Sequence, residues 1–571
     1  MPEVPFRSVP EMAAARAALD PQRTAVRSRA PSGRWADLKW ADLELRRRAI
    51  AAGLQSLGVR HGDVVAVVSP NSAEMLVAEL AAQTAGAAVA PIFPGYSPQV
   101  LHHCLGDSGA RVALAGSAVQ QHQLAPARQL EHIVVLDDQP LPDDHRALPL
   151  KALLGTAQVE TPQAGPGDIA WLLFTSGTTG KPKGVELTHH NALSQQASIA
   201  ALWDVTERDI FLSYLPWHHC FGALFERLMA LWTRALLVVD DSRGRDLDRL
   251  YTNLFDIRPT VYFGVPRVYN GMMARARRDP QALAALQGLR FAFSAAAPLA
   301  EPAFRFFEEL GVPVLEGWGL TETSPCATIT RRTDKSRAPG VVGFPLPGTQ
   351  VKLEPVPDLP KGRGEILVRG PQVMRGYHHR PDDTARVLQD GWLRSGDLGE
   401  WTEHGLRLLG RMDGVFKLEN GEKVSAGEVE ARLLAATPLL EQAVVLGPSQ
   451  PFVTALCWIS TAAAQRFLQD LGVAPPESLA ELVQIPELRR AIVEALQSGN
   501  LFAGVAYERV RRIALVAEVP SLATGELTPT LKMVRAVSTA RHQQLISALR
   551  EERSHAQVLD LFRRGDAFNH A

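Results

Sequence analysis

One stretch, Ile169 to Asn191, limits the possible folds of this chain more than any other. It begins with an apolar run to Phe174 and continues as a loop of glycine, serine, threonine and lysine. The apolar run predicts a buried strand, and the glycines let the following backbone approach a ligand closely. Exposed N–H groups and hydroxyls in such a loop bond phosphate oxygens, and lysines neutralise phosphate charge. The stretch therefore predicts a phosphate-binding loop after a buried strand.

The spacing within this loop disfavours the common nucleotide-binding P-loop. That motif needs four residues between its first and second glycines, followed by Lys-Ser/Thr. Here two residues separate Gly177 from Gly180, and Lys181 is followed by Pro182. A flexible linker is the plain alternative, but linkers rarely follow a buried apolar strand. The candidate nucleotide-binding residues of the loop are Thr175, Ser176, Gly177, Thr178, Thr179, Gly180 and Lys183.

Strands and helices alternate in the chain before this loop. Ala41 to Leu57 carries its apolar residues on one helical face, and Val64 to Val68 is a short apolar strand. Asn71, with Glu74 three residues later, predicts the N-cap of a second helix, and Ala87 to Phe93 predicts the next strand. Such alternation predicts an α/β fold with mainly parallel βαβ sheets and helices on their faces.

Size and composition narrow the class of protein. A chain of 571 residues is too long to fold around a single hydrophobic core, so we expect several subdomains. Its formal net charge of −1 gives no electrostatic reason to expect nucleic-acid binding. Four isolated cysteines lack zinc-site spacing and predict a reduced, cytoplasmic protein. The N-terminus lacks a signal-peptide pattern, and charged residues interrupt the longest apolar region, so we expect no transmembrane segment; peripheral membrane contact stays open.

The phosphate loop resembles that of the adenylate-forming (ANL) superfamily, which includes acyl-CoA synthetases, peptide-synthetase adenylation domains and beetle luciferases. Four further segments resemble the family in the same order: Leu315–Pro325, Asp390–Gly399, Gly410–Glu430 and Gly525–Lys532. The resemblance extends from about Trp40 to Arg535. Within this range, the segments FKLENGE and LTPTLK are more similar to long-chain fatty acyl-CoA synthetases than to other branches of the family.

The resemblance implies roles for residues in the nucleotide and acyl sites. Trp318 would give the adenine a flat surface, and Thr321 would place a hydroxyl near the α-phosphate. Glu322, with Thr178, would hold Mg²⁺. His219, matched from Pro216, would form part of the acyl-pocket wall; a metal at the adjacent histidines is disfavoured because adjacent residues rarely ligate one ion. Two further nucleotide-binding positions are Ala297 and Gly319.

The later segments imply the ribose site, a hinge and a catalytic lysine. Asp397 would accept hydrogen bonds from the ribose hydroxyls, and Arg411 would contact ribose and phosphate. Asp413, before a glycine, matches the hinge, and the loop Leu418–Lys423 matches the one that approaches the thiol acceptor. Lys532 takes the place of the catalytic lysine, whose ammonium stabilises charge that develops in the transition state.

As a whole, the resemblance implies an N-terminal adenylation domain, residues 1–411, and a smaller mobile α+β domain, residues 412–571. It implies that ATP and Mg²⁺ activate a fatty acid to an acyl-adenylate, whose acyl group then passes to the thiol of CoA. Acyl-carrier protein presents the same pantetheine thiol as CoA. A fatty acyl-AMP ligase that loads such a carrier is therefore one alternative. An adenylating enzyme with a non-thiol second step and a non-catalytic acyl-nucleotide binder are the others.

Overall fold

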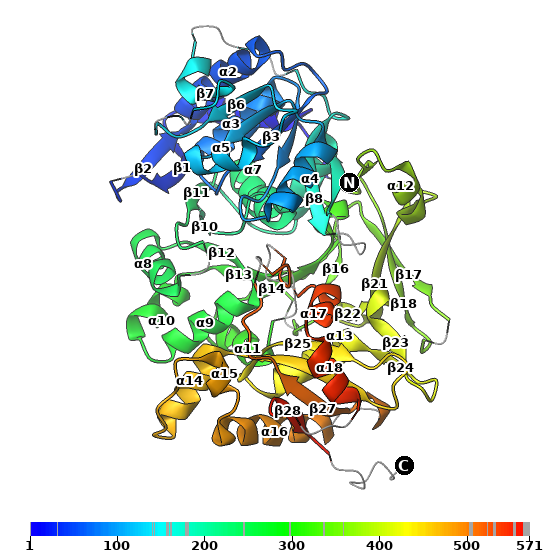
Figure 1. Ribbon diagram of the computed structural model, residues 1–571. Helices are drawn as coiled ribbons and strands as arrows, with labels where there is room; N and C mark the ends of the chain where they lie inside the picture. The colour runs from blue at the N-terminus through cyan, green and yellow to red at the C-terminus, as the bar shows by residue number, and fades with distance from the viewer. Residues whose placement is uncertain are drawn as a thin grey trace. The chain divides into compact units, whose positions relative to one another are not determined.

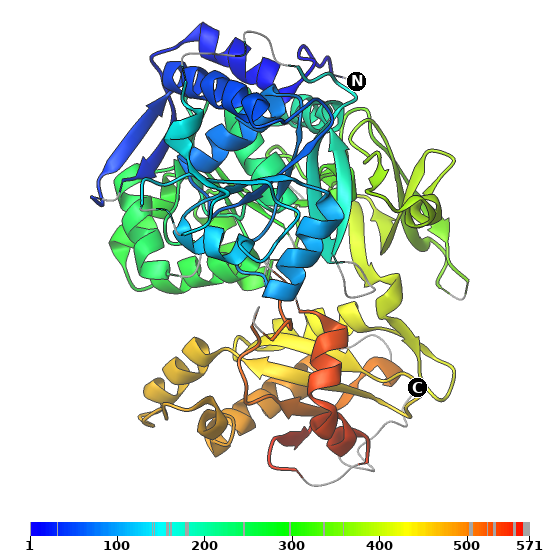
Figure 2. The same cartoon turned by 45° about the horizontal axis from the view of Figure 1, so that its top comes forward.

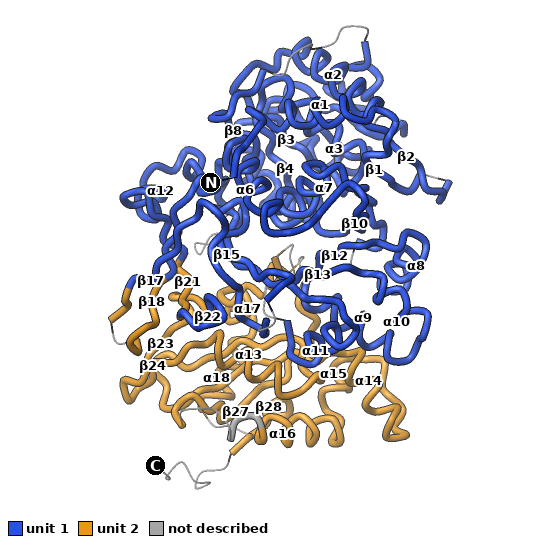
Figure 3. The backbone as a smooth tube through the Cα atoms, turned by 180° about the vertical axis from the view of Figure 1, so that it is seen from behind, with its two compact units in different colours: residues 1–354, 366–395, 401–407 blue, residues 355–365, 396–400, 408–571 orange. Residues whose placement is uncertain are grey.

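The computed structural model of the protein describes residues 2–30, 32–139, 141, 143–155, 159, 163–176, 182–243, 246–295, 299–334, 337–357, 359–501, 506–521, 524–528, 533–551 and 555–562 (Figure 1). The chain packs as two compact units (Figure 3). Unit 1 comprises residues 1–354, 366–395 and 401–407, and unit 2 comprises 355–365, 396–400 and 408–571. Unit 2 thus takes in short segments before residue 412, and the predicted domain boundary at 411/412 stays a prediction.

Two large sheets form the framework of unit 1 in its described part. The strand order of the first is β16-β15-β14-β13-β12-β10-β11-β1-β2, and that of the second is β19-β9-β8-β4-β3-β5-β6-β7. The central strands of both sheets are parallel, as the alternating sequence predicts. The first sheet consists of β1 Thr24–Arg29, β2 Trp35–Lys39, β10 Ile210–Ser213, β11 Leu236–Val239, β12 Val261–Gly264, β13 Phe291–Ser294, β14 Val314–Trp318, β15 Thr328–Ile329 and β16 Phe344–Pro345. The second consists of β3 Val64–Val68, β4 Ala88–Pro91, β5 Val112–Ala115, β6 His132–Val135, β7 Ala147–Pro149, β8 Ile169–Ser176, β9 Pro182–Thr188 and β19 Gly376–Tyr377.

Helices cover these sheets, and in Figure 2 the blue N-terminal helices lie over one side of the strands of unit 1. The helices of unit 1 are α1 Val9–Leu19, α2 Trp40–Ser56, α3 Ala73–Thr84, α4 Pro98–Ser108, α5 Ala118–Leu124, α6 His189–Ala200, α7 Leu228–Thr233, α8 Leu247–Ile257, α9 Pro266–Ala276, α10 Pro280–Gln287, α11 Glu301–Glu309 and α12 Pro381–Val387. A π-helical turn, Phe221–Arg227, precedes α7. Helix α2 confirms the helix predicted from Ala41 to Leu57.

Helix α3 lies between the two sheets of unit 1, because it contacts β1 of one and both β3 and β4 of the other. Every residue of α3 except Glu74 is buried. A helix that is buried on nearly all sides must be surrounded by other elements in this way.

The predicted N-cap of α3 is wrong by one residue. Ser72 caps the helix, and its side chain accepts a hydrogen bond from the Met75 N–H. Asn71 instead joins α3 to a distant segment, since its Nδ2 donates to the Leu215 carbonyl at 2.8 Å and its Oδ1 accepts the Trp217 N–H at 3.0 Å. The Asn71 side chain, which the local sequence favours as the N-cap, is therefore used for tertiary hydrogen bonds instead.

Helix α3 also carries a charged residue into the core of unit 1. Glu79 Oε2 lies 2.7 Å from Arg227 Nη2, and both side chains are only 2% exposed. The indole N–H of Trp171 donates to the same carboxylate oxygen at 3.3 Å. The Arg227 guanidinium lies over the Trp217 ring, 4.9 Å from its centroid. The ion pair thus joins α3 to the π-helical turn.

The order of strands in the main sheet of unit 2 is β25-β26-β27-β28. Its strands are β25 Leu440–Leu446, β26 Val453–Ile459, β27 Val510–Leu515 and β28 Val558–Asp560, and a separate hairpin consists of β23 Val415–Lys417 and β24 Lys423–Ser425. The helices are α13 Ala426–Ala436, α14 Thr461–Asp470, α15 Leu479–Leu482, α16 Pro486–Leu501, α17 Arg535–Arg541 and α18 Gln543–Arg550. The remaining strands, which carry the chain between the units, are β17 Gln350–Pro355, β18 Arg363–Arg369, β20 Leu388–Gln389, β21 Trp392–Thr402 and β22 Gly405–Arg411.

The predicted fold class, a large α/β part followed by a smaller α+β part, is confirmed. Among the described helices, none combines the length and the apolar character that a bilayer span requires.

Candidate active site

The predicted phosphate loop joins two antiparallel strands. Strand β8 ends at Ser176 and β9 begins at Pro182, with Thr175 opposite Lys183. Five residues between the strands lie outside the described residues, as do two other predicted site residues, so their contacts stay predictions. Of the predicted site residues, those outside the description are Gly177, Thr178, Thr179, Gly180, Ala297 and Lys532.

Lys183, at the start of β9, is held by an acidic side chain. Its Nζ lies 3.0 Å from Asp383 Oδ2, and each side chain is 15% exposed. The hydrogen bond from Lys183 lowers the pKa of the Asp383 carboxyl, so the carboxylate is ionised at neutral pH. The ammonium also lies 5.3 Å from the centroid of the Tyr377 ring. A phosphate at this loop would therefore compete with Asp383 for the ammonium.

Glu322 lies on a short 3-10 turn, Thr321–Thr323, that follows strand β14. Its Oε1 accepts a hydrogen bond from the Tyr377 hydroxyl at 2.7 Å, and its backbone carbonyl accepts the Met374 N–H at 2.8 Å. The described residues contain no group of three or more His, Cys, Asp or Glu side chains arranged for a metal. Mg²⁺ needs no such group, because one carboxylate with substrate phosphates and water can satisfy it. The Glu322 carboxylate, together with phosphate oxygens of ATP and water, would supply the oxygen ligands that Mg²⁺ prefers.

The turn before Glu322 is fixed by close contacts. A Cβ added to Gly319 would lie 1.9 Å from the Pro325 carbonyl oxygen, so only glycine fits there. Trp318, at the end of β14, is 6% exposed. The Thr321 hydroxyl is buried 3.3 Å from the Cys220 sulfur. The structure thus brings the segment that contains Trp318 and Thr321 next to the segment that contains His219.

The two adjacent histidines have different environments. His218 is buried, its ring centroid 4.3 Å from that of Phe93, and desolvation lowers its pKa well below the ordinary value. His219 is half-buried, and its Nδ1 accepts the Phe221 N–H at 3.3 Å. The sequence match selected His219, and it is the more accessible of the two.

Within unit 2, Asp397, Arg411 and Asp413 form a chain of ion pairs. Arg411 Nη1 lies 2.9 Å from Asp397 Oδ1, and Arg411 Nε lies 3.3 Å from Asp413 Oδ1. One guanidinium therefore bridges the predicted ribose acceptor and the predicted hinge residue. Two carboxylate oxygens offer about four acceptor positions, so Asp397 can bond Arg411 and still accept from hydroxyl groups.

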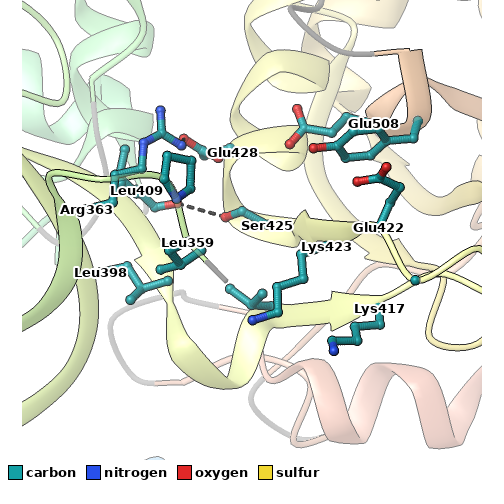
Figure 4. Close-up of a pocket in the computed structure, with 14 residues that line it drawn as sticks. Leu359, Arg363, Leu398, Leu409, Lys417, Glu422, Lys423, Ser425, Glu428 and Glu508 are labelled. Atoms are coloured by element: carbon teal, nitrogen blue, oxygen red, sulfur yellow. Dashed lines mark hydrogen bonds and ion pairs between the residues drawn. The ribbon is translucent and has the colours of Figure 1, made fainter. Parts of the chain in front are cut away.

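The loop predicted to approach the thiol acceptor borders a cavity of about 630 Å³ within unit 2 (Figure 4). Charged side chains on the wall of this cavity have partners in the same unit. Arg363 lies 3.1 Å from Glu400 and 3.8 Å from Glu428. Lys423 donates to the Pro357 carbonyl at 2.7 Å. Burial raises the pKa of the Glu428 carboxyl, since desolvation outweighs the nearby arginine.

Among the residues that the structure describes, Cys220, Tyr377 and Asp383 contact predicted site residues and were not predicted from the sequence. Each is unremarkable in its local pattern. Tyr377 and Asp383 reach the site because β19 pairs antiparallel with β9, with Tyr377 opposite Val185. That pairing joins segments nearly 200 residues apart, and no local signal predicts it.

Glu316, in β14 two residues before Trp318, should make stability depend on pH. Its carboxyl oxygens accept the N–H groups of Leu299 and Gly340 at 3.1 and 3.2 Å, but burial raises its pKa from 4.5 to about 8. The unfolded chain therefore loses this proton at lower pH than the native protein does. Stability contributed by the protonated carboxyl is fully present below pH 4.5 and is lost as pH rises through about 8.

We expect Glu316→Gln to flatten this dependence, because the amide does not titrate. The decrease in Tm between pH 5.5 and 8.5 should be smaller than in the wild type by about 2 °C or more. Glu301→Gln, at an exposed position, is the control. Equal decreases in Glu316→Gln and the wild type would contradict the assignment.

The fold and the described part of the site define the class of protein together. A parallel α/β framework carries the two strands that flank the predicted phosphate loop, and Tyr377 contacts both Lys183 on the second of these strands and the Glu322 carboxylate. The family model described as AMP-binding enzyme matches residues 13–378, more than half of the chain. The protein belongs to the AMP-binding enzyme family, and the predicted membership of the adenylate-forming superfamily is confirmed. The predicted class of enzyme, an AMP-forming acid–thiol ligase, is confirmed with it.

Relatives and solved structures agree with this membership. The long-chain-fatty-acid–CoA ligase FadD15 of Mycobacterium bovis is 29% identical over 90% of this chain and 93% of its own. A feruloyl-CoA synthase of Amycolatopsis sp is 31% identical over 76% of this chain and 84% of its own. The structure of the anthranilate CoA ligase AuaEII in complex with anthranoyl-AMP superposes with a TM-score of 0.78 at 23% identity, covering 95% of this chain and 98% of that one. This last likeness supports the fold alone.

Proposed function

We propose that this protein activates a fatty acid with ATP and transfers the acyl group to the thiol of CoA. The observation that carries the proposal is the likeness to the long-chain-fatty-acid–CoA ligase FadD15, which spans 93% of that ligase and 90% of this chain. The FKLENGE and LTPTLK segments favour the same substrate class.

The first step makes an acyl-adenylate. A carboxylate oxygen of the acid attacks the α-phosphorus of ATP. The bond between this phosphorus and the oxygen that bridges the α- and β-phosphates breaks, and pyrophosphate leaves. The loop from Thr175 to Lys183 would hold the leaving phosphates through its N–H groups, hydroxyls and lysine. Glu322 and Thr178 would hold Mg²⁺, which would neutralise phosphate charge. Lys532 would offer its ammonium to the attacking carboxylate and the α-phosphate.

The second step transfers the acyl group. The CoA thiol gives up its proton to solvent and its sulfur attacks the acyl carbon. The bond between the acyl carbon and the phosphate oxygen breaks, and AMP leaves. Asp397 and Arg411 would hold the ribose through both steps, since an ionised carboxylate accepts from both hydroxyls. The loop Leu418–Lys423 would approach the thiol after the C-terminal domain, residues 412–571, turns about Asp413. His219 would line the acyl pocket.

The test is pyrophosphate release across carboxylic acids from acetate to C18, with and without CoA. The panel includes aryl acids, because the likeness to a feruloyl-CoA synthase favours ferulate-type acids as a second candidate. Turnover with a fatty acid that requires CoA would support the proposal. Turnover with aryl acids alone would replace the fatty acid by an aryl acid.

Release that stops after one turnover despite CoA would point to another acceptor. An acyl-carrier protein is the acceptor to test next, because it ends in the same pantetheine thiol as CoA. Absence of pyrophosphate release with every acid would contradict the proposal. The cytoplasmic location of the protein stays a prediction.

A further inference from the structure

We propose that Tyr377 is a positioning residue that holds the Glu322 carboxylate ready for the metal ion of Mg·ATP. The inference rests on the proposed function, because it takes Glu322 as the metal ligand. It goes further by assigning a role to a side chain outside the predicted phosphate and adenine segments. Two contacts of Tyr377 carry it, one through the hydroxyl and one through the ring.

The hydroxyl contact fixes the orientation of the carboxylate. Tyr377 donates its phenolic hydrogen to Glu322 Oε1 at 2.7 Å. Because this bond uses one acceptor position, Oε2 and the remaining lone pair of Oε1 stay available to a hard cation. A hydrogen bond to a ligating carboxylate restricts its rotation before the ion arrives, and loss of such a bond commonly costs 10- to 100-fold in metal affinity.

The ring contact joins Tyr377 to the phosphate loop. Lys183 Nζ lies 5.3 Å from the ring centroid and 3.0 Å from Asp383 Oδ2. A cation over an aromatic face is attracted to the ring quadrupole. The residues predicted for the metal and for phosphate, Glu322 and Lys183, therefore have a common neighbour in Tyr377.

The backbone around Tyr377 is well anchored, as a positioning role requires. Strand β19 pairs with β9, and the Tyr377 N–H donates to the Thr384 hydroxyl at 2.9 Å. The Met374 N–H donates to the Glu322 carbonyl at 2.8 Å, and the Ser324 hydroxyl donates to the Gln372 carbonyl at 2.8 Å. The segment that carries Tyr377 is thus bonded to the turn that carries Glu322 and to the strand that carries Lys183.

The test is Tyr377→Phe, which removes the hydroxyl and keeps the ring over Lys183. The matched control is Tyr251→Phe, which likewise removes one tyrosine hydroxyl hydrogen bond in the same unit, the 2.7 Å bond to the Met272 carbonyl. Mn²⁺ serves as the spectroscopic probe: its affinity for the enzyme–ATP complex is measured by electron paramagnetic resonance. Pyrophosphate release is measured over a Mg²⁺ titration, and thioester formation is measured from supplied acyl-adenylate.

We expect Tyr377→Phe to bind Mn²⁺ about tenfold more weakly in the presence of ATP and to need about tenfold more Mg²⁺ for half-maximal pyrophosphate release. Thioester formation from acyl-adenylate should stay within about twofold of wild type, because that step releases no pyrophosphate. Tyr251→Phe should match wild type in Mn²⁺ affinity.

Unchanged Mn²⁺ affinity in Tyr377→Phe, or an equal loss in both variants, would overturn the inference. Failure of the proposed function is distinguishable: a wild type that releases no pyrophosphate with any acid would contradict that function, while the Mn²⁺ comparison would still decide the role of Tyr377.

Discussion

Replacement of Lys532 by alanine is expected to lower pyrophosphate release from acid and ATP by at least about 100-fold, the cost of removing one transition-state charge donor. Thioester formation from supplied acyl-adenylate should stay within a few-fold of wild type, since no bond to the α-phosphate forms in that step. The reason is electrostatic: the ammonium stabilises negative charge that is greatest in the first transition state. The two half-reactions, measured separately by pyrophosphate release and thioester formation, give the comparison.

Lys361→Ala provides the control for this variant, because Lys361 is an exposed lysine of unit 2. It should keep both half-reactions at the wild-type rate. An equal loss of both half-reactions in Lys532→Ala would refute the assigned role and would indicate damage to the C-terminal part of the enzyme.

Replacement of Arg227 by methionine is expected to destabilise the protein by about 3–5 kcal/mol, because it leaves Glu79 as an unpaired charge in the core. The 2.7 Å ion pair lies at 2% exposure, so water cannot replace the lost partner without opening the structure. Methionine keeps most of the apolar volume of the arginine. The loss of stability should therefore come from the unpaired charge of Glu79 and not from a cavity. The change is measured as the shift of the urea unfolding midpoint and of Tm.

The double variant Glu79→Met with Arg227→Met separates these causes. Removal of both charges leaves no uncompensated ion, so most of the lost stability should return. If the double variant is as unstable as Arg227→Met, packing rather than charge dominates at this site. A single variant as stable as wild type would show that Glu79 takes up a proton at little cost.

Predictions from local pattern succeeded where a segment's own residues decide its structure. The helix from Ala41 and the strand from Val64 follow from the spacing of apolar side chains, which is a property of the segment alone. The N-cap of α3 failed by one residue, because both Asn71 and Ser72 can cap a helix and only the contacts of Asn71 with the distant Leu215 and Trp217 distinguish them. Local chemistry offered two solutions, and packing selected one.

The residues of the candidate site also fall into two groups, those predicted from sequence motifs and those that only the structure places at the site. The sequence pointed to Glu322, Asp397 and Arg411 through their motifs, and the structure places Asp397 and Arg411 in contact at 2.9 Å. It did not point to Tyr377 or Asp383, because neither stands in a pattern of its own. These two become neighbours of the predicted residues only when β19 pairs with β9.

The sequence by itself determined the alternation of strands and helices and the order of the family's segments, because each depends on residues close together in the chain. The phosphate-binding role of the loop stays a prediction from the same kind of local pattern. The tertiary structure alone decided which distant side chains support those residues: Arg227 for Glu79, Tyr377 for Glu322 and Asp383 for Lys183. The physical reason is that a hydrogen bond or ion pair across the fold depends on the register of paired strands and the packing of helices. Those arrangements are set by the whole core, and no short segment encodes them.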